Sequence, residues 1–447
     1  MMKHKTIYFF LLALVPTFSL SAQQNGQPAE SRTITLGEAV TLGLQNSHQL
    51  QNSQAKIEEA TAALKEAVDR KLPDASVSGS YLRLTTANVD LKSSGGNGGG
   101  GAAPSVSQAM YGLVNASMPL FAGGRIRYGI ESSQLLEKAA KLDAGNNRDE
   151  VIQTTIEAFA TLFKAHSAVR LVKENLKQSQ QRVTDFTNLE KNGLLARNDL
   201  LKAQLQQSNV ELNLLDAENN LELANVNMNL LLGLAPSTRL VLDTNGLAKK
   251  DDPRVLDDYL QMAINNRKDI AALDYRKKAA QTAVKAVKGE KYPAVQLTGG
   301  YIALDIPHFL SVTNALNIGV GVSYNIASLW KNKAKLQQAE ARVKQVTATQ
   351  AMADDNLRLQ VNRNYFNLLS NRKKIEVYAK AKEQAAENYR IVKNKFDNSL
   401  ATTTELLEAD VAQLQASLSY TLARADAFVA YHKLLQTAGV LEAEIKK

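Results

Sequence analysis

Long stretches of the chain place apolar residues at the spacing of an amphipathic helix. Between residues 36 and 72 they recur near every third or fourth position, with no interior proline. Pro73 ends that helix, because a proline disfavours the α conformation in the residue before it. Residues 122–191 and 197–232 predict two further helices, and Gly193 between them is a typical helix stop. Such lengths exceed an ordinary globular core, so we expect the helices to pack side by side as an extended coiled-coil layer.

The whole pattern occurs twice. A shift of 220 residues aligns 36–81 with 256–301, where nine of 46 positions are identical. A shift of 206 residues aligns the rest of the chain without a gap, from about residue 118 onward. The second copy predicts helices at 256–291, 329–397 and 403–438. We therefore expect a first repeat over residues 23–240 and a second over residues 241–447.

Short segments between the helices alternate apolar with polar or small residues. We expect strands near residues 75–90, 106–119, 294–304 and 315–327. The clearest alternation places Leu316, Ile318 and Val320 between Asn317, Gly319 and Gly321. This pattern is typical of a transmembrane barrel strand, although a soluble sandwich shows it too. Four strands cannot close a barrel, for which about eight is the practical minimum, so a membrane barrel would require an oligomer.

Composition and the N-terminus narrow the compartment. The chain has no cysteine, which excludes disulfide scaffolds, thiolate metal sites and cysteine nucleophiles. A basic start followed by an apolar run over residues 7–20 predicts a signal peptide at 1–22, cleaved after Ala22 or Ser21. No later stretch is long and apolar enough for a transmembrane helix, so any membrane span must be β.

Candidate chemistry is sparse. The formal net charge of +9 would suit nucleic acid, but export argues against that partner. The excess of positive charge lies mainly in residues 331–395, along the helix expected over residues 329–397. The histidines lack metal-ligand spacing, and no Gly-x-Ser-x-Gly elbow occurs. We therefore predict no enzyme, no catalytic residue, no metal site and no cofactor.

The order and spacing of the elements resemble the TolC-like outer-membrane efflux proteins, or outer membrane factors, over about residues 33–440. The landmarks are Pro73, Pro293, the strand-to-helix junction 118–125, and the tip segments 192–201 and 398–407. The resemblance implies a mainly α fold with membrane β: a homotrimer whose 12-stranded β-barrel, four strands per chain, continues into a long periplasmic α-helical barrel.

The same resemblance implies a function. The protein would be the passive outer-membrane exit duct of a tripartite efflux pump or type I secretion system in a Gram-negative bacterium. Its partners would be outer-membrane lipid, a periplasmic adaptor (membrane fusion) protein and an inner-membrane transporter. The alternative is an exported coiled-coil scaffold or periplasmic adaptor without a pore.

The resemblance also carries candidate gate residues onto the tips. Glu405 and Glu408 match an acidic ring at the periplasmic entrance, with Glu in place of the more usual Asp. Phe396 matches an aromatic position but lacks a hydroxyl, and Ala401 replaces the arginine of the usual lock. Arg197 and Asp199 on the first tip are candidates for a substitute lock. Without a gate role, acids at a helix N-terminus simply favour the helix dipole.

The remaining expectations concern exposed positions. Adaptor-docking tips are expected at Gly193, Leu194, Ser399 and Leu400. Simple turn chemistry would explain the same residues, since glycine tolerates a left-handed backbone. The glycine-rich run 95–101 predicts an exposed loop. Trp330 is a candidate membrane-interface aromatic, and a simple helix-start anchor explains its position equally well.

Overall fold

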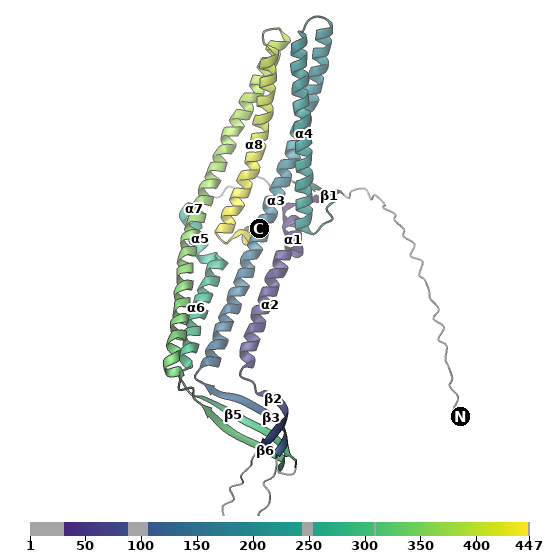
Figure 1. Ribbon diagram of the computed structural model, residues 1–447. Coiled ribbons are helices and arrows are strands. Elements are labelled where there is room, and N and C mark those ends of the chain that lie inside the picture. The colour runs from purple at the N-terminus through teal and green to yellow at the C-terminus, as the bar shows by residue number, and fades with distance from the viewer. Residues whose placement is uncertain (1–30, 88–105, 244–253, 308–309, 446–447) are drawn as a thin grey trace, which may run out of the picture.

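Two very long helices run along the whole helical body. The computed structural model describes residues 31–87, 106–243, 254–307 and 310–445. The long helices are α3 (Arg125–Lys191) and α7 (Ser328–Asp397), and at 67 residues α3 spans about 100 Å (Figure 1). The predicted signal peptide 1–22 and the glycine-rich run 95–101 lie outside the described residues.

Pairs of shorter helices lie end to end beside the long ones. The helices next to the sheet are α2 (His48–Asp69) and α6 (Lys268–Gly289), and those at the far end are α4 (Arg197–Leu232) and α8 (Thr403–Thr437). Contacts give the order α2-α3-α6-α7 near the sheet and α4-α3-α8-α7 near the tips. Helix α3 is therefore central, whereas α2 and α4 form one edge of the layer and α7 forms the other.

The first helix of each half is divided, contrary to the single helices expected over 36–72 and 256–291. The observed helices before the breaks are α1 (Leu36–Asn46) and α5 (Leu256–Asn266). Ser47 adopts an extended backbone, and its hydroxyl accepts a hydrogen bond from the amide of Leu50, which caps α2. The Asn46 side chain donates to the carbonyl of Leu232 at 2.7 Å and so satisfies the end of α4.

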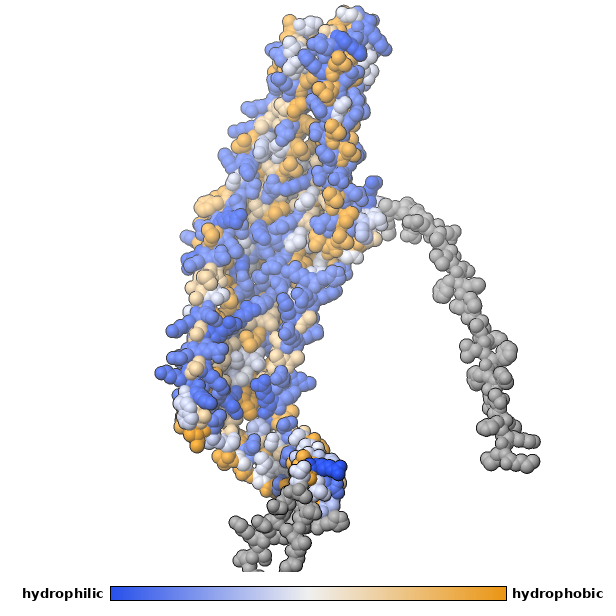
Figure 2. All heavy atoms as spheres, viewed as in Figure 1, coloured by the Kyte–Doolittle hydropathy of each residue, from blue (hydrophilic) through white to orange (hydrophobic). Residues whose placement is uncertain are grey.

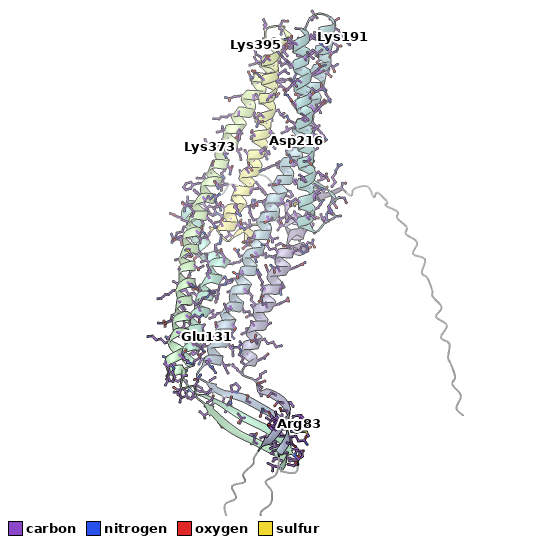
Figure 3. All side chains as sticks on the ribbon, viewed as in Figure 1. Arg83, Glu131, Lys191, Asp216, Lys373 and Lys395 are labelled. Atoms are coloured by element: carbon purple, nitrogen blue, oxygen red, sulfur yellow. The ribbon has the colours of Figure 1, made fainter. Side chains whose placement is uncertain are left out.

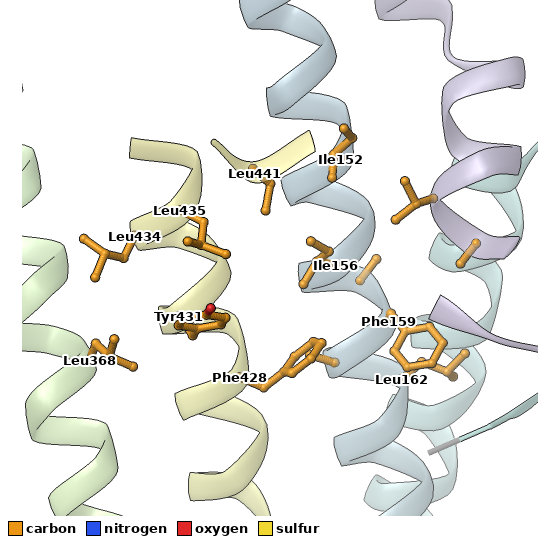
Figure 4. Close-up of a cluster of buried hydrophobic side chains, with 14 of the residues drawn as sticks. Ile152, Ile156, Phe159, Leu162, Leu368, Phe428, Tyr431, Leu434, Leu435 and Leu441 are labelled. Carbon is orange, nitrogen blue, oxygen red and sulfur yellow. The ribbon is translucent and has the colours of Figure 1, made fainter. Parts of the chain in front are cut away.

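A small unit at mid-length was absent from the sequence prediction. It contains the parallel strands β1 (Ser31–Ile34) and β4 (Arg239–Leu242), with α1, α5 and the terminal helix α9 (Leu441–Ile445). Its side chains join the main hydrophobic core, which includes Ile152, Ile156, Phe159, Tyr431 and Leu441 (Figure 4). The larger of the two buried hydrophobic clusters in the described residues therefore lies where the shorter helices meet end to end.

A four-stranded sheet covers one end of the helical layer. Its strands are β2 (Asp74–Ala87), β3 (Val106–Ala122), β5 (Ala294–Ile306) and β6 (Leu310–Ser323), all antiparallel in the order β2-β3-β5-β6. The structure thus starts β6 at 310 and ends it at 323, where the sequence predicted 315–327. None of the helices in the described ranges combines the length and apolarity that a membrane crossing requires.

The register of the sheet separates two kinds of face. Val114, Tyr301 and Leu316 lie in one cross-strand row, and their neighbours Asn115, Gly300 and Asn317 lie in the next. Because successive side chains of a strand point to opposite faces, one face is apolar and the other polar or small. The apolar face is uncovered, since Val77, Leu316 and Ile318 are each 81% exposed. Figure 2 shows further apolar side chains exposed among polar ones along the helical body.

Candidate functional site

The two helical tips have the same backbone geometry. In each turn one residue is left-handed, Gly193 (φ 69°) in the first and Ser399 (φ 61°) in the second. The amides of the next residues, Leu194 and Leu400, donate to carbonyls five positions earlier at 2.8 and 2.7 Å. This is the Schellman arrangement, which closes a helix by satisfying its last carbonyls.

The four predicted docking residues lie at the end farthest from the sheet. Figure 3 locates the two tips by Lys191 and Lys395, just before each turn. Leu194 is 73% exposed and Leu400 is 76% exposed. The turns therefore present two uncovered leucines, which turn formation alone does not require.

The predicted gate aromatic packs between the two hairpins. Phe396 of α7 stacks on Phe186 of α3, with ring centroids 5.2 Å apart and planes 25° apart. Leu200, Ala203 and Leu406 are buried in the same small cluster. Phe396 therefore contributes an apolar contact that holds the second hairpin against the first, and this contact needs no hydroxyl.

A buried ion pair also joins the hairpins, and the sequence analysis missed it. Arg182 of α3 donates to a carboxylate oxygen of Asp410 in α8 at 3.0 Å, and only 7% and 1% of the two side chains are exposed. Asn175 donates to the other oxygen of Asp410 at 3.2 Å. Arg182 also donates to the hydroxyl of Tyr389 at 3.2 Å. The buried charges are thus paired and hydrogen-bonded, as burial requires.

The electrostatics of the pair favour its charged form. Burial acts to lower the pKa of Arg182, but the hydrogen bond to Asp410 and the charge of that carboxylate outweigh burial, so the pKa is raised. A sequence signal existed, because Arg182 lies four positions before Phe186 and Asp410 four after Leu406, on the stripes that pack together.

Glu405 is occupied at the start of α8. The backbone amide and hydroxyl of Thr402 donate to Glu405 Oε2 at 2.7 and 2.9 Å, and Thr402 Oγ1 accepts from the Glu405 amide at 3.3 Å. This is a capping box, and its hydrogen bonds, that of the Thr402 amide first, lower the pKa of Glu405. Glu408 lies one turn farther on and is exposed, with no hydrogen bond or ion pair to any described residue.

The candidates for a substitute lock stay within the first hairpin. Arg197 pairs with Glu190 at 3.6 Å, and Asp199 pairs with Lys202 at 3.2 Å. Lys202 is the residue that crosses between tips, since its ammonium also lies 3.4 Å from the hydroxyl of Thr404. The structure therefore brings Asp199 near the second tip only through Lys202, and Arg197 contacts neither of the predicted gate acids within one chain.

Metal chemistry finds no support in this region. Across the described ranges, no group of three or more His, Asp or Glu side chains is arranged to hold a metal ion. The tips combine uncovered leucines, exposed acids and the contacts that hold the two hairpins together.

Comparison with known proteins points in one direction. The family model for outer membrane efflux proteins matches residues 40–234 and 259–440. The outer membrane efflux protein BepC of Brucella suis is 22% identical over 427 residues, which cover 94% of this chain and 88% of BepC. The outer membrane protein VceC of Vibrio cholerae has the same fold, with a TM-score of 0.74 at 19% identity, covering 90% of this chain and 96% of VceC. The outer membrane channel CmeC of Campylobacter jejuni has a TM-score of 0.75 at 17% identity, covering 91% of this chain and 86% of CmeC.

Proposed function

Because the chain belongs to the outer membrane efflux protein family, we propose that three copies assemble into the exit duct of a tripartite efflux pump or type I secretion system. The duct is passive and takes its energy from an inner-membrane transporter, which it reaches through a periplasmic adaptor. The family favours this function over the alternative of an exported scaffold without a pore.

The cellular location of the protein and its lack of enzymatic activity follow directly from the family. The protein resides in the outer membrane of a Gram-negative cell with a large periplasmic part, and it is not an enzyme.

One observation carries the proposal: both the sheet and the helical layer of a single chain end in open edges. Among the described strands, β2 pairs with β3 alone and β6 with β5 alone. Such unpaired edges are templates for pairing with another chain. Three chains joined edge to edge would give twelve strands, enough to close a barrel whose apolar face meets lipid and whose polar face lines a pore.

The helical edges support the same closure. The exposed apolar side chains of α7 include Met352, Leu359 and Phe366, which recur every seven residues. The α4 edge carries its own exposed leucines, among them Leu205 and Leu212. A seven-residue apolar repeat is the seam of a coiled coil, so the α7 edge of one chain fits the opposite edge of the next chain, which α2 and α4 form together.

We assign the tips two roles. Glu405 and Glu408 ring the periplasmic entrance in the trimer, where six carboxylates near one axis attract cations. Phe396, Arg197 and Asp199 belong to the contacts that hold the entrance closed, and with Ala401 in place of arginine the resting entrance is looser than is usual in the family. Gly193, Leu194, Ser399 and Leu400 dock the adaptor, with the two exposed leucines as apolar anchors.

Assembly and conductance test this proposal together. Each chain has a mass of 48.8 kDa before processing, so light scattering in mild detergent should give a protein mass close to three mature chains. The same sample should form ion-conducting pores in planar bilayers. A monomer that conducts no current would contradict the duct and favour the alternative, an exported scaffold without a pore.

A further inference from the structure

The helical layer ends in a strongly basic collar next to the sheet. We define the collar as residues 65–74, 122–131, 285–292 and 324–335, which together contain eleven lysines and arginines but five carboxylates. Glu66 and Glu290 already pair with Arg70 and Lys335. Most of the collar's cations therefore have no counter-charge in the described part of the chain.

Exposed aromatic and apolar side chains lie at the same level. Trp330 is 63% exposed, and its sequence neighbour Leu329 is exposed as well. Leu72 and Tyr292, which follow the sheet ends of α2 and α6, are also exposed. Figure 3 marks this level by Glu131, at the sheet end of the helices. A band of aromatic rings and cations bordering an apolar surface is the composition of a membrane–water interface.

Some of the collar's cations line grooves on one face of the layer. One groove is lined by Arg70 and Arg125, and a second by Lys335. Both grooves contain Val287 and Glu290 of α6, so they lie on the same face. We call this side the groove face.

Four other cations lie on the opposite face. Arg127, Lys285, Lys288 and Lys333 each differ by two positions from a groove residue: Arg125, Val287, Glu290 and Lys335 respectively. Two positions turn an α-helix by about 200°, so these side chains project away from the grooves. All four are exposed, and within the described residues they form no ion pair, although the Lys285 ammonium lies over the ring of Tyr128.

The small mid-length unit identifies the outer face. Asn367 of α7 lines a groove and lies 32 positions, nearly nine turns, after Lys335, so it shares the groove face. Tyr365, two positions earlier, points the other way, and its ring lies 6.1 Å from that of Tyr259 in α5. The small unit therefore packs on the face opposite the grooves.

Closure of the ring then decides which face is outside. This step rests on the proposed trimer, in which twelve helices about 10 Å apart enclose a bore roughly 30 Å wide. Three copies of the small unit, each with two helices about 10 Å across, would fill that bore. The small units must be outside, and with them Arg127, Lys285, Lys288 and Lys333.

We propose that these four cations form a binding surface for the headgroups of anionic phospholipids in the leaflet that faces the periplasm. The collar directly follows the apolar-faced sheet, so its outer side lies at headgroup depth when the sheet spans the bilayer. Juxtamembrane lysines and arginines attract anionic lipid, and the attraction falls off within a Debye length. The nearby acid Glu131 receives a long hydrogen bond from Thr282 and is outnumbered by the cations.

The single tryptophan of the chain reports on this surface. Trp330 lies three positions before Lys333 on α7, so the two side chains are neighbours on the helix. Trimers would be reconstituted in vesicles that mix phosphatidylcholine with phosphatidylglycerol, with bromine on the acyl chains of one lipid at a time. Brominated phosphatidylglycerol should quench Trp330 more strongly, corresponding to about a threefold binding preference at low salt that declines as salt is added.

A matched pair of variants tests whether the lipid preference comes from this surface or from positive charge in general. The outer variant Arg127→Gln/Lys285→Gln/Lys288→Gln/Lys333→Gln should bring the preference close to one. The groove variant Arg70→Gln/Arg125→Gln/Lys335→Gln removes similar charge from the other face and should keep the preference. Equal quenching by both lipids in the wild type, no quenching by either, or equal loss in both variants would overturn the proposal.

The same samples test the trimeric duct and the lipid-binding collar separately. Light scattering and conductance report on the trimeric duct, whereas bromine quenching reports on the collar. A trimer that conducts ions but shows no lipid preference would contradict the collar proposal and leave the duct proposal standing. A non-conducting monomer sinks the duct before any lipid is tested.

Discussion

The central helix α3 and the edge helix α7 are nearly equal in length but differ in burial. Helix α3 has 67 residues and buries nineteen of them, whereas α7 has 70 residues and buries four. Within the described part of the chain, α3 has neighbours in the layer on both sides, and α7 has them on one side. The difference teaches that burial here is set by position in the layer, and it fits the proposed trimer, in which another chain would cover each edge.

The apolar pattern of the edges fits this view. On α7 the exposed residues Met352, Leu359 and Phe366 keep a seven-residue step, and on α4 Leu223 and Leu230 do the same. A solvated edge would gain nothing from such a repeat, whereas a partner helix would bury it. The following changes test the contrast between centre and edge, beginning with the largest expected effect.

Charge placed in the edge seam should abolish assembly. Leu359→Glu/Phe366→Glu puts two carboxylates where the neighbouring chain would bury apolar side chains, at a cost of several kcal/mol per interface. We expect the trimeric fraction in light scattering to fall at least tenfold. The control Gln360→Glu adds charge beside the seam and should leave the trimer intact. Trimers that survive the double change would show that α7 is not an interface.

Removing the buried ion pair between Arg182 and Asp410 should destabilise the packing of the two hairpins but leave the trimer assembled. Arg182→Met removes the counter-charge of the buried Asp410, which keeps its hydrogen bond from Asn175, and this costs about 3–5 kcal/mol. Hydrogen exchange should accelerate at the start of α8 and around Arg182 in α3. The double variant Arg182→Met/Asp410→Leu removes both charges and should recover most of the loss, because an apolar pair can replace a buried ion pair. Protection that never changes would mean that the pair contributes nothing to holding the hairpins.

Neutralising the tip acids should change conduction more than stability. Glu405→Gln/Glu408→Gln removes the proposed cation ring, and glutamine can still accept from the Thr402 amide, so the capping box remains. In planar bilayers the variant should lose cation selectivity and block by multivalent cations added on the periplasmic side. Selectivity equal to the wild type would reduce these residues to helix-terminal acids.

Acid pH provides a companion measurement on the same helix start. The pKa of Glu405 is lowered by its bonds to Thr402, so the charged cap stabilises α8 above the ordinary glutamate pKa. That contribution is lost as the pH falls through the lowered pKa. Helix protection at the tip should therefore weaken in acid for the wild type, and less so for Glu405→Gln.

The smallest expected effects lie in the two turns. Gly193→Ala should cost about 1 kcal/mol, because alanine resists a positive φ, and Ser399→Gly should gain somewhat less than that. Gly129→Ala is an opposite-sign control, since it lies inside α3 with open space around it and should stabilise. Urea unfolding followed by circular dichroism would measure all three. A stabilising Gly193→Ala would show that the left-handed turn is not needed.

The helices and strands were predictable because their signals are long and local. Repeated spacing and Pro73 indicated where the helices lie and end, yet the break at Ser47 was missed because one extended residue barely disturbs the apolar spacing. Strands β1 and β4 have four residues each, too few for an alternating pattern. The family resemblance located the tip acids, but the pairing of Arg182 with Asp410 depends on how the hairpins align, which no local pattern specifies.

The central helix α3 crosses the mid-length unit without interruption, whereas α2 and α4, which form the edge beside it, lie on either side of that unit. A small rotation of the long helices about the mid-length unit would therefore displace their tips by a larger distance. The 36 residues of α4 reach about 54 Å from the mid-length unit to the tip. A tilt of roughly 10° about that unit would move the tip sideways by about 9 Å, close to the diameter of a helix. A change of aperture at the tips therefore requires no melting of secondary structure, only a small rotation at the mid-length unit.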